Sequence, residues 1–144
     1  MPPTDFSLST TQRILIGCFA LLVLGAVFLF QQVDFLSWLV SKEDHPNSHF
    51  AAMRLVRVLI NDVSMLLLLM AWFNSRSVIK LAFAIQLIDL FILLPLYLGF
   101  KLYSEGNSEI SSPLLSQFHR LIVNPTLMIL LIPAVYFQRL MKQK

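Results

Sequence analysis

The sequence is poor in charged residues and in cysteine. Asp, Glu, Lys and Arg make up 13% of the 144 residues, about half of their share in ordinary globular proteins. The single cysteine, Cys18, excludes a disulfide within the chain and a cysteine-based metal cluster. Phosphate loops, serine triads, zincin motifs and dinucleotide fingerprints are also missing. We therefore predict a protein that is not an enzyme and that carries no cofactor and no metal.

Apolar residues are abundant instead, and they are gathered into long runs. They make up 57% of the chain, and the mean hydropathy is +0.73. Four runs reach about 20 residues, the length at which a helix crosses roughly 30 Å of hydrocarbon. The sequence thus predicts an all-α polytopic membrane protein, a four-transmembrane-helix bundle. The net charge of +3 reflects basic residues beside the spans, so we infer no nucleic-acid binding.

Polar and proline-containing segments divide the runs. We expect the first helix to start at Ser9 or Thr10, residues of the type that caps helices. The turn at 74–77 is short, so the spans beside it should form an antiparallel hairpin, and Pro95 should kink the third span. The predicted order is a cytoplasmic tail (1–12), span one (13–32), a periplasmic connector (33–48), span two (49–73), a cytoplasmic turn (74–77), span three (78–100), a periplasmic loop (101–113), span four (114–137) and a basic cytoplasmic tail (138–144).

The distribution of basic residues sets the orientation. Lys and Arg beside the spans gather on one side, which the positive-inside rule makes cytoplasmic: Arg13, Arg76, Lys80, Arg139, Lys142 and Lys144. The opposite connectors hold Lys42 and Lys101, all three histidines and most of the acidic residues. Both termini should therefore face the cytoplasm, with the spans arranged as two helical hairpins.

Two segments repeat one pattern at the outer ends of spans two and four. Arg57-Val-Leu-Ile-Asn61 and Arg120-Leu-Ile-Val-Asn124 each place an Arg and an Asn four residues apart, and so on one helix face. With Arg54, the three guanidinium groups should converge near the outer leaflet, where they would bind a phosphate or a carboxylate. The alternative is that the arginines extend to the interface or pair with Glu105 or Glu109, while the asparagines bond between helices.

Four further polar residues fall within the predicted spans: Asp62 and Ser64 in span two, and Gln86 and Asp89 in span three. Charged groups inside a membrane are costly and usually face the bundle interior. We interpret both carboxyls as neutral or paired with an arginine. A proton relay or an intramembrane enzyme using Asp62 and Asp89 is a less favoured alternative.

Cysteine and histidine chemistry is not favoured by depth or spacing. Cys18 should lie roughly 7 Å inside the cytoplasmic face, whereas His119 should lie at the opposite face. The two are too far apart for a Cys-His pair. His45, His49 and His119 share one side, but their spacing is not that of a metal site.

Three segments resemble the small exosortase F system-associated membrane proteins of Bacteroidota. They are RLVRVLINDVSMLLLLMAWF, LAFAIQLIDLFILLPLYLGF and, most specifically, FHRLIVNPTLMILLIPAVYFQRL with its Arg, Asn-Pro and Ile-Pro-Ala. The likeness covers roughly residues 50–140. It implies a role beside an exosortase, a membrane cysteine transpeptidase-like enzyme that cleaves sorting signals. The catalytic residues of that enzyme have no matching set in this sequence.

The leading hypothesis is a non-enzymatic accessory subunit in the bacterial inner membrane. Its partners would be lipid and the exosortase or the transmembrane tail of its substrate, and it would be able to form a homo-oligomer. The alternative is a small lipid- or anion-binding transport component whose site is the arginine cluster. An intramembrane enzyme is the third hypothesis.

Overall fold

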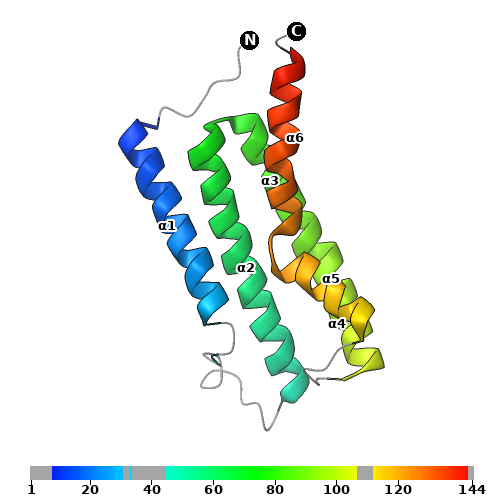
Figure 1. Ribbon diagram of the computed structural model, residues 1–144. Coiled ribbons are helices and arrows are strands. Elements are labelled where there is room, and N and C mark those ends of the chain that lie inside the picture. The colour runs from blue at the N-terminus through cyan, green and yellow to red at the C-terminus, as the bar shows by residue number, and fades with distance from the viewer. Residues whose placement is uncertain (1–7, 31–32, 34–44, 107–111, 143–144) are drawn as a thin grey trace.

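The computed structural model describes residues 8–30, 33, 45–106 and 112–142, and these residues are almost all helical (Figure 1). The elements in chain order are α1 (Thr10–Leu29), α2 (Pro46–Phe73), α3 (Arg76–Ile88), the π-helical η1 (Asp89–Leu93), α4 (Leu94–Ser104), α5 (Pro113–Val123) and α6 (Thr126–Lys142). Most of the predicted periplasmic connector and loop, as well as the ends of both tails, lie outside the described residues.

Three helices are long and apolar enough to cross a membrane. They are α1, α2 and the continuous helix that α3, η1 and α4 form over 29 residues. The pair α5 and α6 meets the same criterion only when taken together, and the two are bent by 61° with respect to each other. Over the residues that the structure describes, the chain is therefore all-α with three candidate spans, or four if the bent pair is one span.

The helix starts follow from local sequence signals. Ser9 is the N-cap of α1, as predicted, and it exchanges hydrogen bonds with Gln12 in a capping box. Pro46 falls in the predicted connector (33–48), but it begins α2. A proline is well suited to the first helical turn because the N–H that it lacks would have no partner there. The turn between α2 and α3 passes through Asn74 in the left-handed conformation, with φ 46°, which asparagine tolerates.

The fourth predicted span is two helices instead of one. The sequence predicts a single helix over 114–137, whereas the structure ends α5 at Val123 and starts α6 at Thr126. Asn124 has an extended conformation, which is the conformation that a following proline imposes. Pro125 also has no N–H for the carbonyl of Leu121. The break lies near the middle of the bundle (Figure 1).

The bundle has two distinguishable ends. At the first, which we call the terminal end, α1 begins, α2 turns into α3 and α6 finishes (Figure 1). At the second, the loop end, α1 finishes, α2 begins, and α4 and α5 meet. Helix α1 lies along one side of α2, and the other helices lie along the opposite side.

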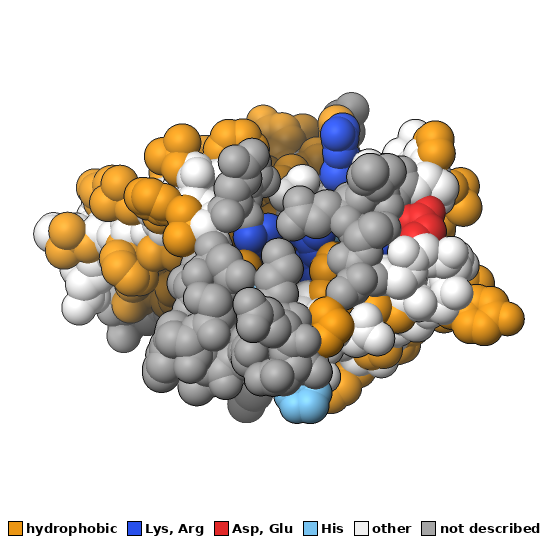
Figure 2. Space-filling view, turned by 90° about the horizontal axis from the view of Figure 1, so that it is seen from below, with side chains coloured by type: hydrophobic (Ala, Val, Ile, Leu, Met, Phe, Trp, Pro, Cys, Tyr) orange, Lys and Arg blue, Asp and Glu red, His pale blue; other side chains and the backbone are white. Residues whose placement is uncertain are grey.

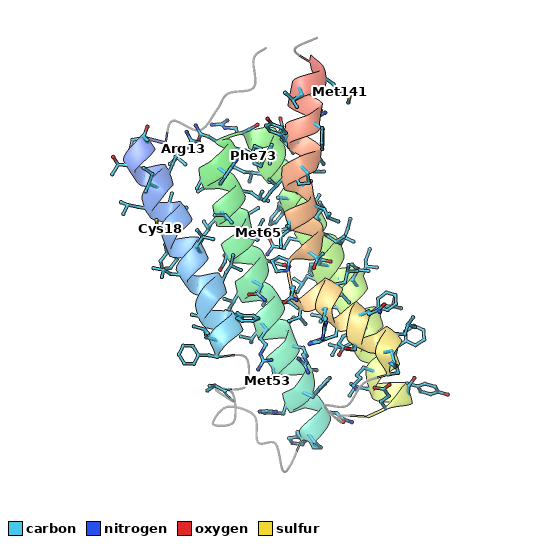
Figure 3. All side chains as sticks on the ribbon, viewed as in Figure 1. Arg13, Cys18, Met53, Met65, Phe73 and Met141 are labelled. Atoms are coloured by element: carbon cyan, nitrogen blue, oxygen red, sulfur yellow. The ribbon has the colours of Figure 1, made fainter. Side chains whose placement is uncertain are left out.

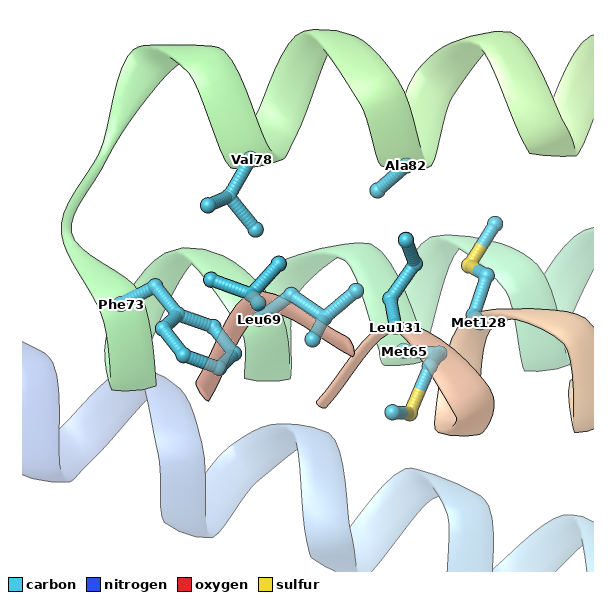
Figure 4. Close-up of a cluster of buried hydrophobic side chains, with 8 residues drawn as sticks. Met65, Leu69, Phe73, Val78, Ala82, Met128 and Leu131 are labelled. Atoms are coloured by element: carbon cyan, nitrogen blue, oxygen red, sulfur yellow. The ribbon is translucent and has the colours of Figure 1, made fainter. Parts of the chain in front are cut away.

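Apolar side chains form one core in each half. The core of the terminal half joins α2, α3 and α6 (Figure 4) through Met65, Leu69, Phe73, Val78, Ala82, Met128, Leu131 and Val135. The core of the loop half joins α2, α4 and α5 through Val58, Leu94, Tyr97, Ile122 and Val123. The polar residues Asn61, Asp62, Ser64, Gln86 and Asp89 lie between these two cores along the chain, and all of them are buried. We call these five residues the polar layer.

Helix α1 approaches α2 closely through small residues. Ala20 is the buried residue of α1, and a Cβ built on Gly17 would lie 3.7 Å from the Cβ of Ala71. Arg13 adds a polar contact at the terminal end (Figure 3), where its Nε and Nη2 donate to the carbonyls of Ala71 at 2.8 Å and Trp72 at 2.9 Å. These carbonyls belong to the last turn of α2, whose helix leaves them without partners.

Candidate functional site

Basic side chains gather at the loop end. Arg54 and Arg57 come from α2, Lys101 from α4, and His119 and Arg120 from α5. All four cationic groups lie within electrostatic range of His119. Figure 2, which views the molecule from this end, shows Lys and Arg side chains near the middle of the face. We call these five residues the basic cluster.

Arg54 faces the bundle and contacts α5. Its Nη1 lies 3.0 Å from Nε2 of His119. A guanidinium can only donate, so Nε2 accepts and the ring is held in the tautomer with its proton on Nδ1. The guanidinium also lies 5.0 Å from the centre of the Phe50 ring, and the ring of Tyr97 lies 5.6 Å from that of His119. Arg54 is therefore held in place between α2, α4 and α5, which differs from an arginine that extends to the interface.

Lys101 is the member of the cluster that the sequence did not reveal. It was expected in a solvated loop, but it lies in α4 and its side chain is 1% exposed. Its Nζ donates to Oε2 of Glu105, and the N–H of Ser112 donates to Oε1 of Glu105 at 2.7 Å. These bonds hold the pKa of the Glu105 carboxyl below its usual range. The four-residue spacing of Tyr97, Lys101 and Glu105 was the available signal, because it places them on one helix face.

Arg57 lines a pocket between α1 and α2. The pocket has a volume of about 190 Å³ and is otherwise bounded by the apolar residues Ala26, Val27, Phe30 and Ile60. Arg54 and Asn61 lie about 20° apart around α2, whereas Arg57 is offset from Asn61 by about 40°. The predicted stripe on α2 therefore divides, with Arg54 and Asn61 facing α5 and Arg57 at the pocket.

The prediction that each Arg-x-x-x-Asn segment lies on one helix face is wrong for the segment in span four. Asn124 follows the last residue of α5, is exposed, and does not share a helix face with Arg120. Arg120 is exposed as well. Glu105 binds Lys101, and Glu109, the other expected partner of Arg120, lies outside the described residues. The residue of α5 that meets the α2 arginines is His119.

Asn61 supports the break in the bent pair. Its Nδ2 donates to the carbonyl of Val123 at 2.7 Å, in a buried position. This carbonyl is in the last turn of α5, where the helix provides no donor. Ser64 donates to the carbonyl of Ile60 in its own helix at 2.7 Å. Both side chains thus have structural roles, and Asn61 bonds between helices as one of the two predictions proposed.

The two carboxyls of the polar layer face each other's helices. Asp62 and Asp89 are both 0% exposed, and they lie close enough for their charges to interact. The carboxylate oxygens of both residues lack a hydrogen-bond partner among the residues that the structure describes, and so does Oε1 of Gln86. The expected pairing with an arginine is likewise not seen in that part of the chain.

Cys18 lies apart from both groups. Cys18 is exposed on α1 near the terminal end (Figure 3), whereas His119 lies in α5 at the loop end. His45 caps α2 without a side-chain bond, and His49 is buried in its first turns. Within residues 8–30, 33, 45–106 and 112–142, no three His, Cys, Asp or Glu side chains come together as a metal site.

The geometry thus offers two kinds of binding chemistry. The basic cluster presents guanidinium and ammonium donors, which suit a carboxylate or a phosphate. The polar layer presents oxygen acceptors. The chain matches no protein-family model, and it shows no significant similarity to a curated protein or to a solved structure.

Proposed function

We propose that the chain is a four-span protein of the bacterial inner membrane, with both termini in the cytoplasm, and that it is a non-enzymatic accessory subunit of an exosortase-type sorting system. The bent pair α5 and α6 is its fourth span. Arg13, Arg76 and Lys80 at the terminal end support a cytoplasmic location for that end. The loop end is then periplasmic, where sorting signals are cleaved.

The exposed surface of α1 carries this proposal. One of its 20 residues is buried, and its outward side chains include Phe19 at 60%, Leu22 at 72% and Phe28 at 69% exposure. A helix that is joined to the bundle along one side leaves most of its surface for a second membrane helix. Because lipid is as apolar as leucine, such association depends on close packing between helices, and the open surface of α1 would supply one side of that packing to the exosortase or to the tail of its substrate.

Co-purification in mild detergent tests the subunit role. The tagged chain should bring the exosortase out of native membranes, and the double variant F19A/L22A should lower the recovered amount several-fold. The matched control is F91A/L96A, which removes two similarly exposed side chains from η1 and α4. The proposal fails if the chain emerges alone from membranes in which other complexes survive, or if both double variants behave as the parent.

A second candidate function is the binding of an anionic head group or a carboxylate by the basic cluster. The observation in its favour is the convergence of Arg54, Lys101 and His119 beside the exposed Arg120. Arginine forms two parallel bonds to a phosphate or carboxylate, which lysine cannot reproduce. The anion would bind from the loop end, and Arg57 would reach it from the α1–α2 side.

Lipid retention distinguishes this function from the first. In nanodiscs that contain phosphatidylglycerol and phosphatidylcholine, the parent should retain the anionic lipid preferentially, and R54K and R57K should each reduce that preference several-fold. The control L55A lies at the same depth and should leave it unchanged. Equal lipid retention by the parent and both Lys variants would rule this function out, and it would leave the partner proposal standing.

A further inference from the structure

The middle of the bundle contains a group of buried oxygen atoms without donors. Asp62 is in α2, Gln86 in α3, and Asp89 at the start of η1. Their exposures are 0%, 7% and 0%. The four carboxylate oxygens and Oε1 of Gln86 lack a hydrogen-bond partner in the described part of the chain.

The charges of Asp62 and Asp89 interact across the two helices, and Gln86 shares a helix face with Asp89. Gln86 and Asp89 are three residues apart and so lie on one face of their helix. Asp62 lies about 100° around α2 from Asn61. Because Asn61 faces α5, Asp62 is turned toward α3 and η1, in agreement with its electrostatic contact with Asp89.

Two irregular stretches of backbone lie at this depth. The π-helical turn begins at Asp89 itself, and π turns within α-helices occur frequently at functional sites. The break between α5 and α6 lies near Asp62. The adjacent residue Asn61 donates to the carbonyl of Val123, which is the last residue of α5. Irregular backbone inside a membrane is tolerated where it is buried in protein or lines a cavity, and broken helices next to buried carboxyls are typical of cation sites in transporters.

The chemistry of the group selects its ligand. Five oxygen acceptors with no donor attract a cation, and carboxylate and amide oxygens are hard ligands. Two ionised carboxyls in an apolar interior would be strongly unfavourable, so when one monovalent ion is bound the second carboxyl would carry a proton. A magnesium ion gives up its water reluctantly, and this site is closed to solvent on all sides that the structure describes. A monovalent ion is easier to dehydrate.

We propose that Asp62, Gln86 and Asp89 form a binding site for a hard monovalent cation of the sodium type. The inference does not depend on the exosortase or on lipid binding. The cation would join α2 to the helix α3–η1–α4 at the level of the break, and it would stabilise the bundle.

Sodium-dependent stability of the purified full chain tests the site. At equal ionic strength and mildly alkaline pH, replacing choline chloride by sodium chloride should raise the Tm by about 5 °C. The variants D62N and D89N keep the side-chain shape and should abolish the sodium shift. The control E105Q removes a carboxylate outside the polar layer and should retain it. Calorimetric titration of the unmodified chain with sodium chloride measures binding directly, so the test does not depend on the folding of a variant.

Three results would overturn the site. The first is an equal Tm in sodium and choline chloride together with no heat of sodium binding. The second is a full sodium shift in well-folded D62N and D89N. The third is a shift that magnesium chloride produces and sodium chloride does not, because that would assign the oxygens to a divalent ion.

Discussion

The terminal end and the loop end of the bundle differ in the contacts between their helices. At the terminal end, α2, α3 and α6 meet through a cluster of aliphatic side chains, Phe73 and methionines. At the loop end, Arg54 also joins α2 to His119 of α5, and Glu105 joins the end of α4 to α5 by accepting from the N–H of Ser112. Apolar packing alone distinguishes poorly between neighbours in a membrane, since lipid is equally apolar. Directional polar bonds at the loop end therefore help to specify that α2, α4 and α5 meet, whereas α2, α3 and α6 meet at the terminal end through apolar packing.

The largest effect should come from the terminal core. Leu69 is 0% exposed, and L69A would leave a cavity among α2, α3 and α6. We expect a loss of about 2–5 kcal/mol in the free energy of unfolding, measured by equilibrium unfolding in detergent. The control L22A removes the same group from a side chain that is 72% exposed and should stay within about 0.5 kcal/mol of the parent. Similar losses in both variants would contradict a packed terminal core.

The next effect concerns the asparagine at the middle of the bundle. N61A removes the donor to the buried carbonyl of Val123, and an unsatisfied buried carbonyl should cost about 1–3 kcal/mol of unfolding free energy. N124A, in the other Arg-x-x-x-Asn segment, removes an exposed side chain and should be close to neutral. If the two asparagines proved equally important, the distinction between the segments would be lost.

A smaller effect is expected where Arg13 joins α1 to α2. R13A removes two bonds to the carbonyls of Ala71 and Trp72 and should lower the unfolding free energy by about 1 kcal/mol. R13K retains the positive charge near the helix C-terminus but loses the paired geometry, so it should be intermediate. A Lys variant as stable as the parent would show that charge alone is sufficient at this position.

The smallest effect should be a pH dependence at the loop end. The bonds from Lys101 and Ser112 lower the pKa of Glu105 in the folded chain, so the carboxylate favours the folded state at neutral pH. This contribution should disappear as the pH falls through the lowered pKa. E105Q should therefore show a weaker decrease in Tm than the parent when the pH is lowered through the glutamate range. Parallel Tm profiles for the two chains would exclude the contribution.

Local signals predicted a substantial part of the fold. The cap at Ser9 and the hairpin turn after Phe73 follow from short sequence features, and both are present. The prolines were less informative. Pro133 remains within α6, Pro95 follows the π turn, and Pro125 lies at the break. At Pro125 the helix breaks, and Asn61 of α2 donates to a backbone carbonyl in the last turn of α5. Such a contact between helices cannot be predicted from the local sequence.

The candidate site was predicted in composition more than in geometry. Arg54 and Arg57 lie at the loop end as expected. Arg120 and Asn124 were placed on one face by assuming a continuous helix over 114–137, whereas α5 ends at Val123. Lys101 was assigned to a loop because it follows the apolar run, and its pairing with Glu105 depends on the helix continuing to Ser104. Sequence spacing therefore predicted which side chains share a helix face only in segments where the helix is continuous.

The π turn has a consequence for changes in chain length. Buried residues of α3 recur at spacings of three or four up to Asp89, the next one is Leu94, five positions later, and the short spacing then resumes through Tyr97 to Lys101. The turn thus absorbs one extra residue. Deleting the exposed Ile92 would yield a regular α-helix that still points Leu94, Tyr97 and Lys101 into the bundle. A deletion at Phe83 would instead rotate every later side chain by about 100°. The segment that begins at Asp89 is therefore the place where this helix can lose a residue without losing its alignment.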